Sequence, residues 1–291
     1  MYYSGIDQHK RDCMITTYDT EGHRVKQQRV PNSCARLRRY FTEFTGPHRA
    51  VVESTGFWYW LADLLEELGV ELTLAHATRL KAIAAAKVKT DRLDSDLLAQ
   101  LHRADLIPAA HRIAREARGP RDLLRLRLRL VGKRVSCLNS IERIREKYHV
   151  SRGDQLDPWY QQQVDVYDTQ VALLTQQIHD VEATLHPHLI PNADTQRLLW
   201  IPGIGKVNAL TIWTEIDGIA RFPTESQFLS YCRLVPGADN SGGRVRQRPG
   251  SKQGNRYLKL AFNHASIRAI QLLQRPGEKH NLETDGDRRR T

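Results

Sequence analysis

Four acidic residues in the first third of the chain stand at positions where a carboxylate needs a partner. Asp7 ends a short apolar run typical of a buried β-strand, and Glu53 ends a second run of this kind. Asp91 and Asp94 open a segment with helical spacing, and their i, i+3 separation puts both on one helical face. An unpaired buried charge costs roughly several kcal/mol unless it is paired or holds a metal ion. Whether these carboxylates share a cation depends on the elements that carry them.

The segments around these residues alternate between strand and helix patterns. We expect strands at 2–7, in two runs within 13–30 around a turn at 19–22, at 46–53 and at 70–75, and helices at 33–44, 57–69 and 91–104. In this β-β-β-α-β-α-β-α order the first and fourth strands are neighbours, so Asp7 and Glu53 can face each other at one sheet edge. Asp91 and Asp94 would complete a cluster of four carboxylates. Mg²⁺ or Mn²⁺ suits such a set of oxygen ligands.

Each of these residues also has an ordinary structural explanation. Asp91, or Thr90 before it, could cap the helix, Glu53 could be a surface residue at a strand end, and Asp7 could cap a turn. Asp96 points to a different helical face and is left out of the cluster. The joint occurrence of all four at positions that one topology brings together favours the metal site.

The charge balance indicates a polyanionic partner. The 291 residues contain 44 Lys+Arg against 33 Asp+Glu, a formal net charge of +11. The excess is concentrated in 111–152 and 233–275, where a solvated face is the alternative to a nucleic-acid surface. Four scattered cysteines without a CxxC pair indicate a reducing compartment, and no apolar run is long enough to span a bilayer. We therefore expect a cytoplasmic protein without a membrane segment.

The middle of the chain predicts two long helices. The run 121–148 contains an alternating "LRLRLRL", but its longer apolar spacing favours a helix with a seam at Leu124, Leu128, Val131, Val135 and Leu138. A second helix keeps the 3-4 spacing through Val164, Tyr167, Val171, Leu174, Ile178, Val181 and Leu185. An antiparallel hairpin within one chain and a coiled coil between subunits both satisfy this pattern. Beyond residue 190 the sequence predicts short helices, with a glycine turn "PGIG" that either binds phosphate or is a simple tight turn.

Several motifs resemble a known family. "GIDQHK", "VVESTG" and "KTDRLDSDLLAQL" are similar to the Asp-Glu-Asp-Asp transposases of bacterial insertion sequences, whose RuvC-like N-terminal domain has the RNase H fold of Holliday-junction resolvases. "IPGIGKVNALTIWTEI", "RFPTESQFLSYCRLVPG" and "SGGRVRQRPGSKQGNRYLKLAF" resemble the C-terminal transposase domain of that family. The resemblance covers roughly residues 2 to 270. It implies that Asp7, Glu53, Asp91 and Asp94 are the metal ligands.

The resemblance also implies a fold and a domain order. We expect an α/β protein with an RNase H-like mixed sheet and flanking helices, a helical coiled-coil insertion and a small, mainly helical C-terminal domain. The expected divisions are a RuvC-like catalytic domain at 1–110, the coiled-coil region at 111–190, the C-terminal transposase domain at 191–275 and a disordered or altered tail at 276–291. Relative to the family, this polar tail resembles a truncation or a shifted reading frame.

A serine that attacks DNA and becomes covalently linked to it is a further implication of the resemblance. The matching residue is Ser241, beside Gly242 and Gly243, although an ordinary turn and the nearby Ser251 are alternatives. A serine needs activation by a base or a metal. Basic residues expected to bind nucleic acid are Arg125, Arg129, Lys133, Arg244, Arg246, Arg248, Lys252 and Arg256.

The expected function is a metal-dependent DNA recombinase that moves an insertion sequence by phosphoryl transfer. The resemblance further implies a homo-oligomer, dimer or tetramer, and a structured non-coding guide RNA. The basic composition by itself indicates only that a polyanion binds. Two alternatives remain at this point: a Holliday-junction resolvase-like nuclease in which the metal activates water, and a nucleic-acid-binding protein that has lost catalysis.

Overall fold

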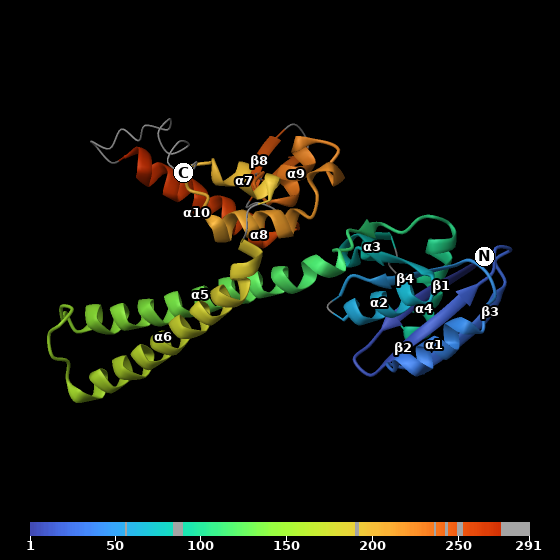
Figure 1. The fold of residues 1–291 in the computed structure, drawn as a ribbon, viewed down its shortest axis with the longest axis horizontal. Helices are drawn as coiled ribbons and strands as arrows, with labels where there is room; N and C mark the ends of the chain where they lie inside the picture. Colours follow the sequence, from blue (N-terminus) through green and yellow to red (C-terminus); the bar gives the residue numbers. More distant parts are fainter. Residues whose placement is uncertain are drawn as a thin grey trace. The chain divides into compact units, whose positions relative to one another are not determined.

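The computed structural model divides the chain into two compact units, Met1–Ile113 and Ala114–Thr291 (Figure 1). It describes residues 1–55, 57–83, 90–189, 192–235, 237–241, 244–248 and 253–274, with the backbone alone for 189, 237–241, 244–248 and 273. The expected tail at 276–291 lies outside the described residues.

The first unit is a six-stranded mixed sheet with helices on both faces. Its elements are β1 (Tyr2–Gln8), β2 (Asp12–Tyr18), β3 (Arg24–Pro31), α1 (Cys34–Thr42), β4 (His48–Glu53), α2 (Tyr59–Glu67), β5 (Val70–Ala75), α3 (Ala77–Ile83), α4 (Asp91–Arg103) and β6 (Ala109–Ala110). The strand order is β3-β2-β1-β4-β5-β6, with β4 parallel to β1 and β5 and the other neighbouring pairs antiparallel. The first three strands are antiparallel neighbours in chain order, a β-meander, and they lie where strands were predicted. The sheet is consistent with the RNase H-like fold.

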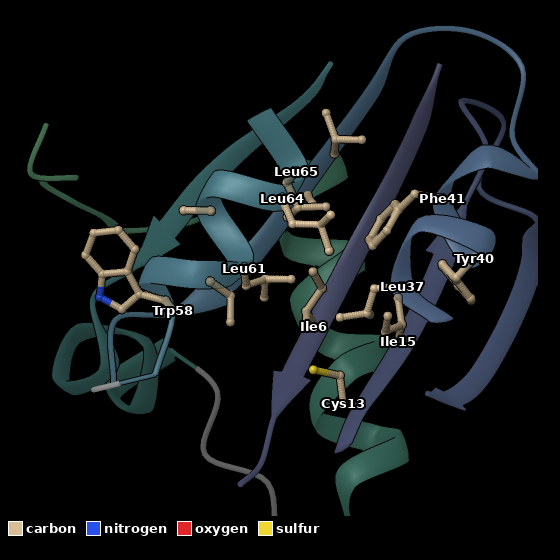
Figure 2. Close-up of a cluster of buried hydrophobic side chains, with 14 of the residues drawn as sticks. Ile6, Cys13, Ile15, Leu37, Tyr40, Phe41, Trp58, Leu61, Leu64 and Leu65 are labelled. Carbon is tan, nitrogen blue, oxygen red and sulfur yellow. The ribbon is translucent and has the colours of Figure 1, made fainter. Parts of the chain in front are cut away.

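The two faces of the sheet are covered by different helices. Apolar residues of α1 and α2, among them Leu37, Phe41 and Leu61, pack on Ile6 and Val52 of the central strands (Figure 2). Helix α4 covers the other face, where Leu98 packs with residues of β4, β5 and α3. Because side chains alternate along a strand, the residues next to Ile6 and Val52 face α4. The sequence analysis did not predict α3 or β6, since both are short and lack an apolar period.

Gly5 sets the distance between β1 and α4. A Cβ at this position would lie 2.1 Å from the carbonyl oxygen of Ser95 and 2.4 Å from the amide nitrogen of Ala99. The hydroxyl of Ser95 also hydrogen-bonds with that of Thr16 on β2, at 2.8 Å, in a buried position. The helix backbone therefore lies directly on the strand, which only glycine permits here.

The second unit begins with a helical hairpin and ends in a small domain. Its elements are α5 (Arg115–Lys147), α6 (Pro158–Leu185), η1 (His186–Leu189), α7 (Ala193–Leu199), α8 (Lys206–Ile216), η2 (Ile219–Arg221), α9 (Glu225–Tyr231), β7 (Gly237–Ser241), β8 (Arg244–Arg248) and α10 (Arg256–Leu273). Helices α5 and α6 run side by side within one chain (Figure 1). The side chains of Arg127 and Glu182 join them at 2.6 Å. The helical interpretation of the "LRLRLRL" run is thereby confirmed.

The seam of α5 differs from the expected one. Val135 and Leu138, which we predicted to be in the seam, are 45% and 41% exposed. Leu124, also predicted for the seam, is buried, and the other buried apolar residues of the helix are Leu130, Cys137 and Ile141. The closely spaced leucines of this run lie on two neighbouring faces of the helix. Helix α6 packs on the face that continues through Cys137. The predicted seam of α6 does face the hairpin at Val164, Ile178 and Leu185, which are buried.

The glycine turn between α7 and α8 has a packing role. Gly203 has a φ of +89°, and a Cβ there would lie 2.3 Å from the carbonyl oxygen of Ala265 on α10. Ala209, Ile212 and Leu258 form the core beneath this turn. Close packing against α10 thus accounts for Gly203, and phosphate binding at the turn stays a prediction.

We predict that Gly5→Ala separates α4 from β1 and destabilises the first unit. Overpacking of this kind costs about 1–3 kcal/mol, and here the clash is with backbone, which cannot rotate away. Thermal unfolding should show a lower midpoint, and amides of α4 should exchange hydrogen faster. Gly132→Ala is the control, because nothing lies within 4 Å of its Cβ position and alanine favours an exposed helix. An unchanged exchange rate in α4 would contradict the prediction.

Candidate active site

The four predicted carboxylates lie at one end of the sheet, on the face covered by α4. The register pairs Ile6 with Val52, so Asp7 and Glu53 follow side by side on the parallel strands β1 and β4. Both alternate to the same face as Gly5. Asp91 and Asp94 lie in the first turn of α4, which packs on this face. The close contact at Gly5 is therefore what brings the helix carboxylates toward Asp7.

The electrostatics of Asp7 reflect the other three carboxylates. Partial burial raises the pKa of Asp7, and the negative charges of Asp91, Asp94 and Glu53 raise it further, whereas His9 acts in the opposite direction. The net effect is an upward shift of the Asp7 pKa. Ionised carboxylates in this arrangement repel each other, and a cation relieves the repulsion.

His9 is a member of the cluster that the sequence analysis missed. Its Nε2 lies 3.1 Å from an oxygen of Asp7 and 3.2 Å from an oxygen of Asp91. The ligand atoms of these three residues all lie within 4.8 Å of one another. The signal was present in "GIDQHK", because His9 stands two residues after Asp7, directly beyond the end of β1. Carboxylate oxygens with one imidazole form a donor set that fits a divalent cation.

Arg29 contributes a positive charge beside Asp91. Its guanidinium contacts Asp91 at 2.5 Å and Asp12 at 2.7 Å. The hydrogen bond from Arg29 is the main cause that lowers the pKa of Asp91. Arg29 and His9 thus hold Asp91 from two sides. Arg29 lies on β3, which the sequence analysis treated only as part of the meander.

Two structural explanations for the acidic residues can be examined directly. Thr90 caps α4, since its hydroxyl accepts a hydrogen bond from the amide of Leu93 at 3.3 Å, so the capping role does not fall on Asp91. Asp96 accepts hydrogen bonds from Tyr18 and Gln100, each at 2.6 Å. This contact on another helical face agrees with leaving Asp96 out of the cluster.

The predicted serine lies at the end of a short β-hairpin. Ser241 is the last residue of β7 and pairs with Arg244, the first residue of β8; Arg246 and Arg248 follow on the same strand. For these residues the structure describes the backbone. Lys252 and the alternative serine, Ser251, lie outside the described residues.

The other predicted nucleic-acid residues differ in their surroundings. Arg129 and Lys133 are exposed on α5, and Arg256 is exposed at the start of α10. Arg125 is engaged inside the protein instead. Its guanidinium donates to Glu215 of α8, with Nη2 at 2.8 Å from Oε2, and stacks on the ring of Tyr257. This gives Arg125 a structural partner that the sequence did not reveal.

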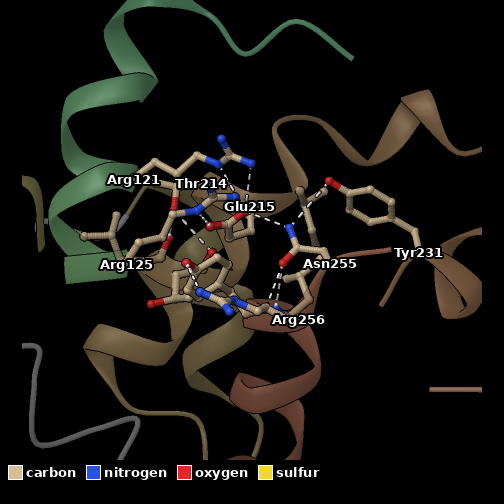
Figure 3. Close-up of polar contacts among 12 residues, drawn as sticks. Arg121, Arg125, Thr214, Glu215, Tyr231, Asn255 and Arg256 are labelled. Atoms are coloured by element: carbon tan, nitrogen blue, oxygen red, sulfur yellow. Dashed lines mark hydrogen bonds and ion pairs between the residues drawn. The ribbon is translucent and has the colours of Figure 1, made fainter. Parts of the chain in front are cut away.

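Glu215 is the centre of a buried polar cluster (Figure 3). It is 1% exposed and receives hydrogen bonds from Arg121 at 3.0 Å, from Arg125, and from the side chain of Asn255 at 2.7 Å. Asn255 also caps α10. Burial raises the pKa of Glu215, but the hydrogen bond from Arg125 and the two positive charges outweigh it, so the net shift is downward. The cluster ties α5, α8 and α10 together.

The chain is similar to known transposases over both units. A family model described as Transposase matches residues 4–149, and one described as Transposase IS116/IS110/IS902 family matches residues 195–280. None of the helices in the described ranges is long and apolar enough to cross a membrane.

Individual relatives agree with this similarity. The transposase for insertion sequence element IS1111A of Coxiella burnetii is 23% identical over 212 residues, which are 67% of this chain and 58% of that protein. A probable family 20 transposase of Pseudomonas aeruginosa is 24% identical over 90% of this chain and 82% of its own length. The transposase for insertion sequence element IS1328 of Yersinia enterocolitica is 23% identical, with 88% and 80% covered. The chain thus spans less than two thirds of the first of these relatives.

We predict that Glu215→Ala destabilises the C-terminal domain by about 3–5 kcal/mol, because the buried guanidinium of Arg121 loses the carboxylate that compensates its charge. Since folding lowers the Glu215 pKa, its contribution is present above about pH 4.5 and is lost as the pH falls through the folded pKa. Urea unfolding across pH measures both effects. Glu182→Ala, which breaks the partly exposed pair with Arg127, should cost about 0–1 kcal/mol. An equal loss of unfolding free energy in Glu215→Ala and Glu182→Ala would contradict this account.

Proposed function

The chain belongs to the IS116/IS110/IS902 family of transposases, and from that premise we propose that it cuts and rejoins DNA to move an insertion sequence. The observation that carries the proposal is the electrostatic coupling of Asp7 with Glu53, Asp91 and Asp94 at one end of the sheet. These residues would hold a divalent metal ion, Mg²⁺ or Mn²⁺. His9 supports the same role through its contacts with Asp7 and Asp91.

Each protein group has a defined task in this proposal. A bound divalent ion would supply Lewis-acid chemistry and offset the charge on the scissile phosphate. Asp7 and Glu53, on adjacent strands, fix one side of the site, and Asp91 and Asp94 fix the other through α4. Arg29 must share Asp91 with the ion, so metal binding competes with an existing ion pair. The metal ion would therefore bind more readily once a substrate phosphate has bound Arg29 and freed Asp91.

The covalent step is assigned to Ser241. The oxygen of its hydroxyl attacks the phosphorus, a new serine–phosphate ester forms, and the DNA oxygen leaves with the proton that the serine gives up. The reverse reaction with another DNA end restores the serine. Because one phosphodiester replaces another, bond energy is conserved for rejoining, which a recombinase needs and a hydrolytic nuclease does not. Arg244, Arg246, Arg248 and Lys252 would bind phosphates beside it.

The partners of the protein follow the same proposal. Arg129, Lys133 and Arg256, all exposed, suit contacts with a nucleic-acid backbone, while Arg125 would contribute through its place in the Glu215 cluster. By family resemblance, the proposal also includes binding of a structured guide RNA, assembly into a dimer or tetramer, and a location in the bacterial cytoplasm. The exposed residues Val135 and Leu138 on α5 are available for contacts between subunits. A resolvase-like nuclease, or a binding protein without catalysis, is the alternative to be tested.

We predict that Asp7→Asn weakens Mn²⁺ binding by more than about 10-fold and abolishes DNA strand cleavage. The estimate is a lower bound, since even outer partners of metal ligands cost about 10- to 100-fold in affinity. Calorimetric titration of Mn²⁺ and a cleavage assay measure the two effects. Asp96→Asn is the matched control on α4, because Asp96 binds Tyr18 and Gln100. Unchanged Mn²⁺ affinity in Asp7→Asn would show that the cluster is not the metal site.

The serine is tested by trapping the protein–DNA adduct. Ser241→Ala should remove the adduct and strand exchange while folding and nucleic-acid binding stay unchanged, since the substitution removes only one hydroxyl oxygen beside two glycines. Ser251→Ala is the control. Loss of the adduct in Ser251→Ala alone would move the nucleophile to that residue. Recombination by both variants would reject the serine mechanism in favour of metal-activated water.

A further inference from the structure

A basic hollow lies along the outer strand of the sheet, next to the carboxylate cluster. It has a volume of about 650 Å³ and is lined by Met14, Arg24, Val25, Lys26, Gln27, Gln28, Arg29 and Arg92. Of these described lining residues, four are basic and none is acidic. None of the four was among the residues that the sequence analysis assigned to nucleic acid. A hollow with this lining favours an anionic occupant.

The backbone that forms the hollow is an exposed sheet edge. In the order of the described strands, β3 is the outermost and pairs with β2 alone. Such an edge presents backbone amides outward, in addition to the side-chain donors. From Arg24 to Arg29 a strand extends roughly 17 Å, which matches about five nucleotides of a stacked strand.

The side chains of β3 and α4 hold the hollow in shape. Gln27 donates to the hydroxyl of Thr16 at 2.9 Å and to the backbone carbonyl of Arg92 at 3.1 Å. This bridge fixes the first turn of α4, which carries Arg92 and Asp91, beside the strand. Arg29 extends from the hollow to Asp91. One wall of the hollow is thus shared with the carboxylate cluster.

The basic groups are not equally available. Lys26 is paired with Glu43 and lies 4.8 Å from the centre of the Tyr40 ring, contacts made on the face covered by α1. Arg24 is exposed, and its nearest carboxylate oxygen in an ion pair, on Asp96, is 3.7 Å away. Arg92 is also exposed. Arg24 and Arg92 are therefore the guanidinium groups best placed to bind a phosphate.

We propose that this hollow binds the phosphodiester backbone of a nucleic-acid strand and leads it to the carboxylate cluster. Guanidinium groups bind phosphate oxygens in a bidentate manner, and the exposed amide of Gln28 adds a neutral donor. The proposal rests on the proposed function, since it places the strand beside the site where cleavage would occur. Its contacts go to the backbone, so it gives the strand a path without selecting a sequence.

The test measures binding in the absence of metal, so that it is independent of cleavage. Full-length protein in EDTA is titrated into fluorescently labelled 20-nucleotide strands, one of DNA and one of RNA, at several salt concentrations. The variant Arg24→Gln/Arg92→Gln should bind at least one strand more weakly, with a slope of log affinity against log salt that is shallower by roughly 1–2. The two probes show which nucleic acid uses the hollow.

The matched control removes two charges from the opposite face of the same unit. Arg36→Gln/Arg39→Gln lies on α1, where both residues are exposed, and should leave both slopes unchanged. Equal slopes for the wild type and the Arg24/Arg92 variant with both probes would overturn the proposal. Circular dichroism confirms that both variants fold.

A local probe separates this surface from other basic regions of the chain. A photocrosslinking phenylalanine analogue at Val25, which is exposed and lines the hollow, should crosslink to the strand, and Arg24→Gln/Arg92→Gln should abolish the crosslink. The same analogue at Arg39 should not crosslink. Absence of a crosslink at Val25, or its persistence in the double variant, would overturn the proposal even if Asp7 proves essential for cleavage. Crosslinking at Val25 with an inactive cluster would instead refute only the proposed function.

Discussion

The contact between α4 and β1 at Gly5 is the constraint on which the candidate site depends. Without a side chain at Gly5, the helix backbone lies directly on the strand, and Ser95 is fixed there by its buried hydrogen bond with Thr16. This close packing sets the first turn of α4 beside the end of β1. Asp91 and Asp94 can approach Asp7 only because the residue two positions earlier is a glycine. The close packing at Gly5 thus determines which negative charges lie near Asp7.

The carboxylates that this contact brings together are balanced by two basic side chains of the same unit. His9 bridges Asp7 and Asp91, and Arg29 links Asp91 to Asp12. Arg29 also lines the basic hollow along β3, so one guanidinium belongs to both features. A phosphate that enters the hollow would compete with Asp91 for Arg29. In the proposals made above, binding of the strand would therefore free a carboxylate for the metal ion through this single side chain.

The sequence predicted the local elements well because their signals are local. Short apolar runs identified the strands that end near Asp7 and Glu53, and helical spacing identified α4. The place of His9 two residues after Asp7 was a usable local signal, but Arg29 could not be placed in the same way, since its role depends on which strand lies next to which. The prediction of the α5 seam was correct at Leu124 but wrong at Val135 and Leu138 for a related reason. The repeated leucines place apolar residues on two faces of the helix, and only the partner helix decides which face is buried. Glu215 shows the limit most clearly, because a single glutamate in an apolar helix does not identify its distant arginine partners.

Glu215 and Asp7 illustrate how the surroundings decide the task of a carboxylate. Glu215 is hydrogen-bonded to two guanidinium groups and an amide, which lower its pKa. Its negative charge is compensated by these neighbours inside the protein. Partial burial and the negative charges of three other carboxylates raise the pKa of Asp7 against the effect of one imidazole. The first arrangement is complete without any ligand and serves packing among α5, α8 and α10. The second has more negative than positive charge and gains stability from a cation. This difference in charge balance is the physical reason to place the chemistry at the sheet edge and not at the buried cluster.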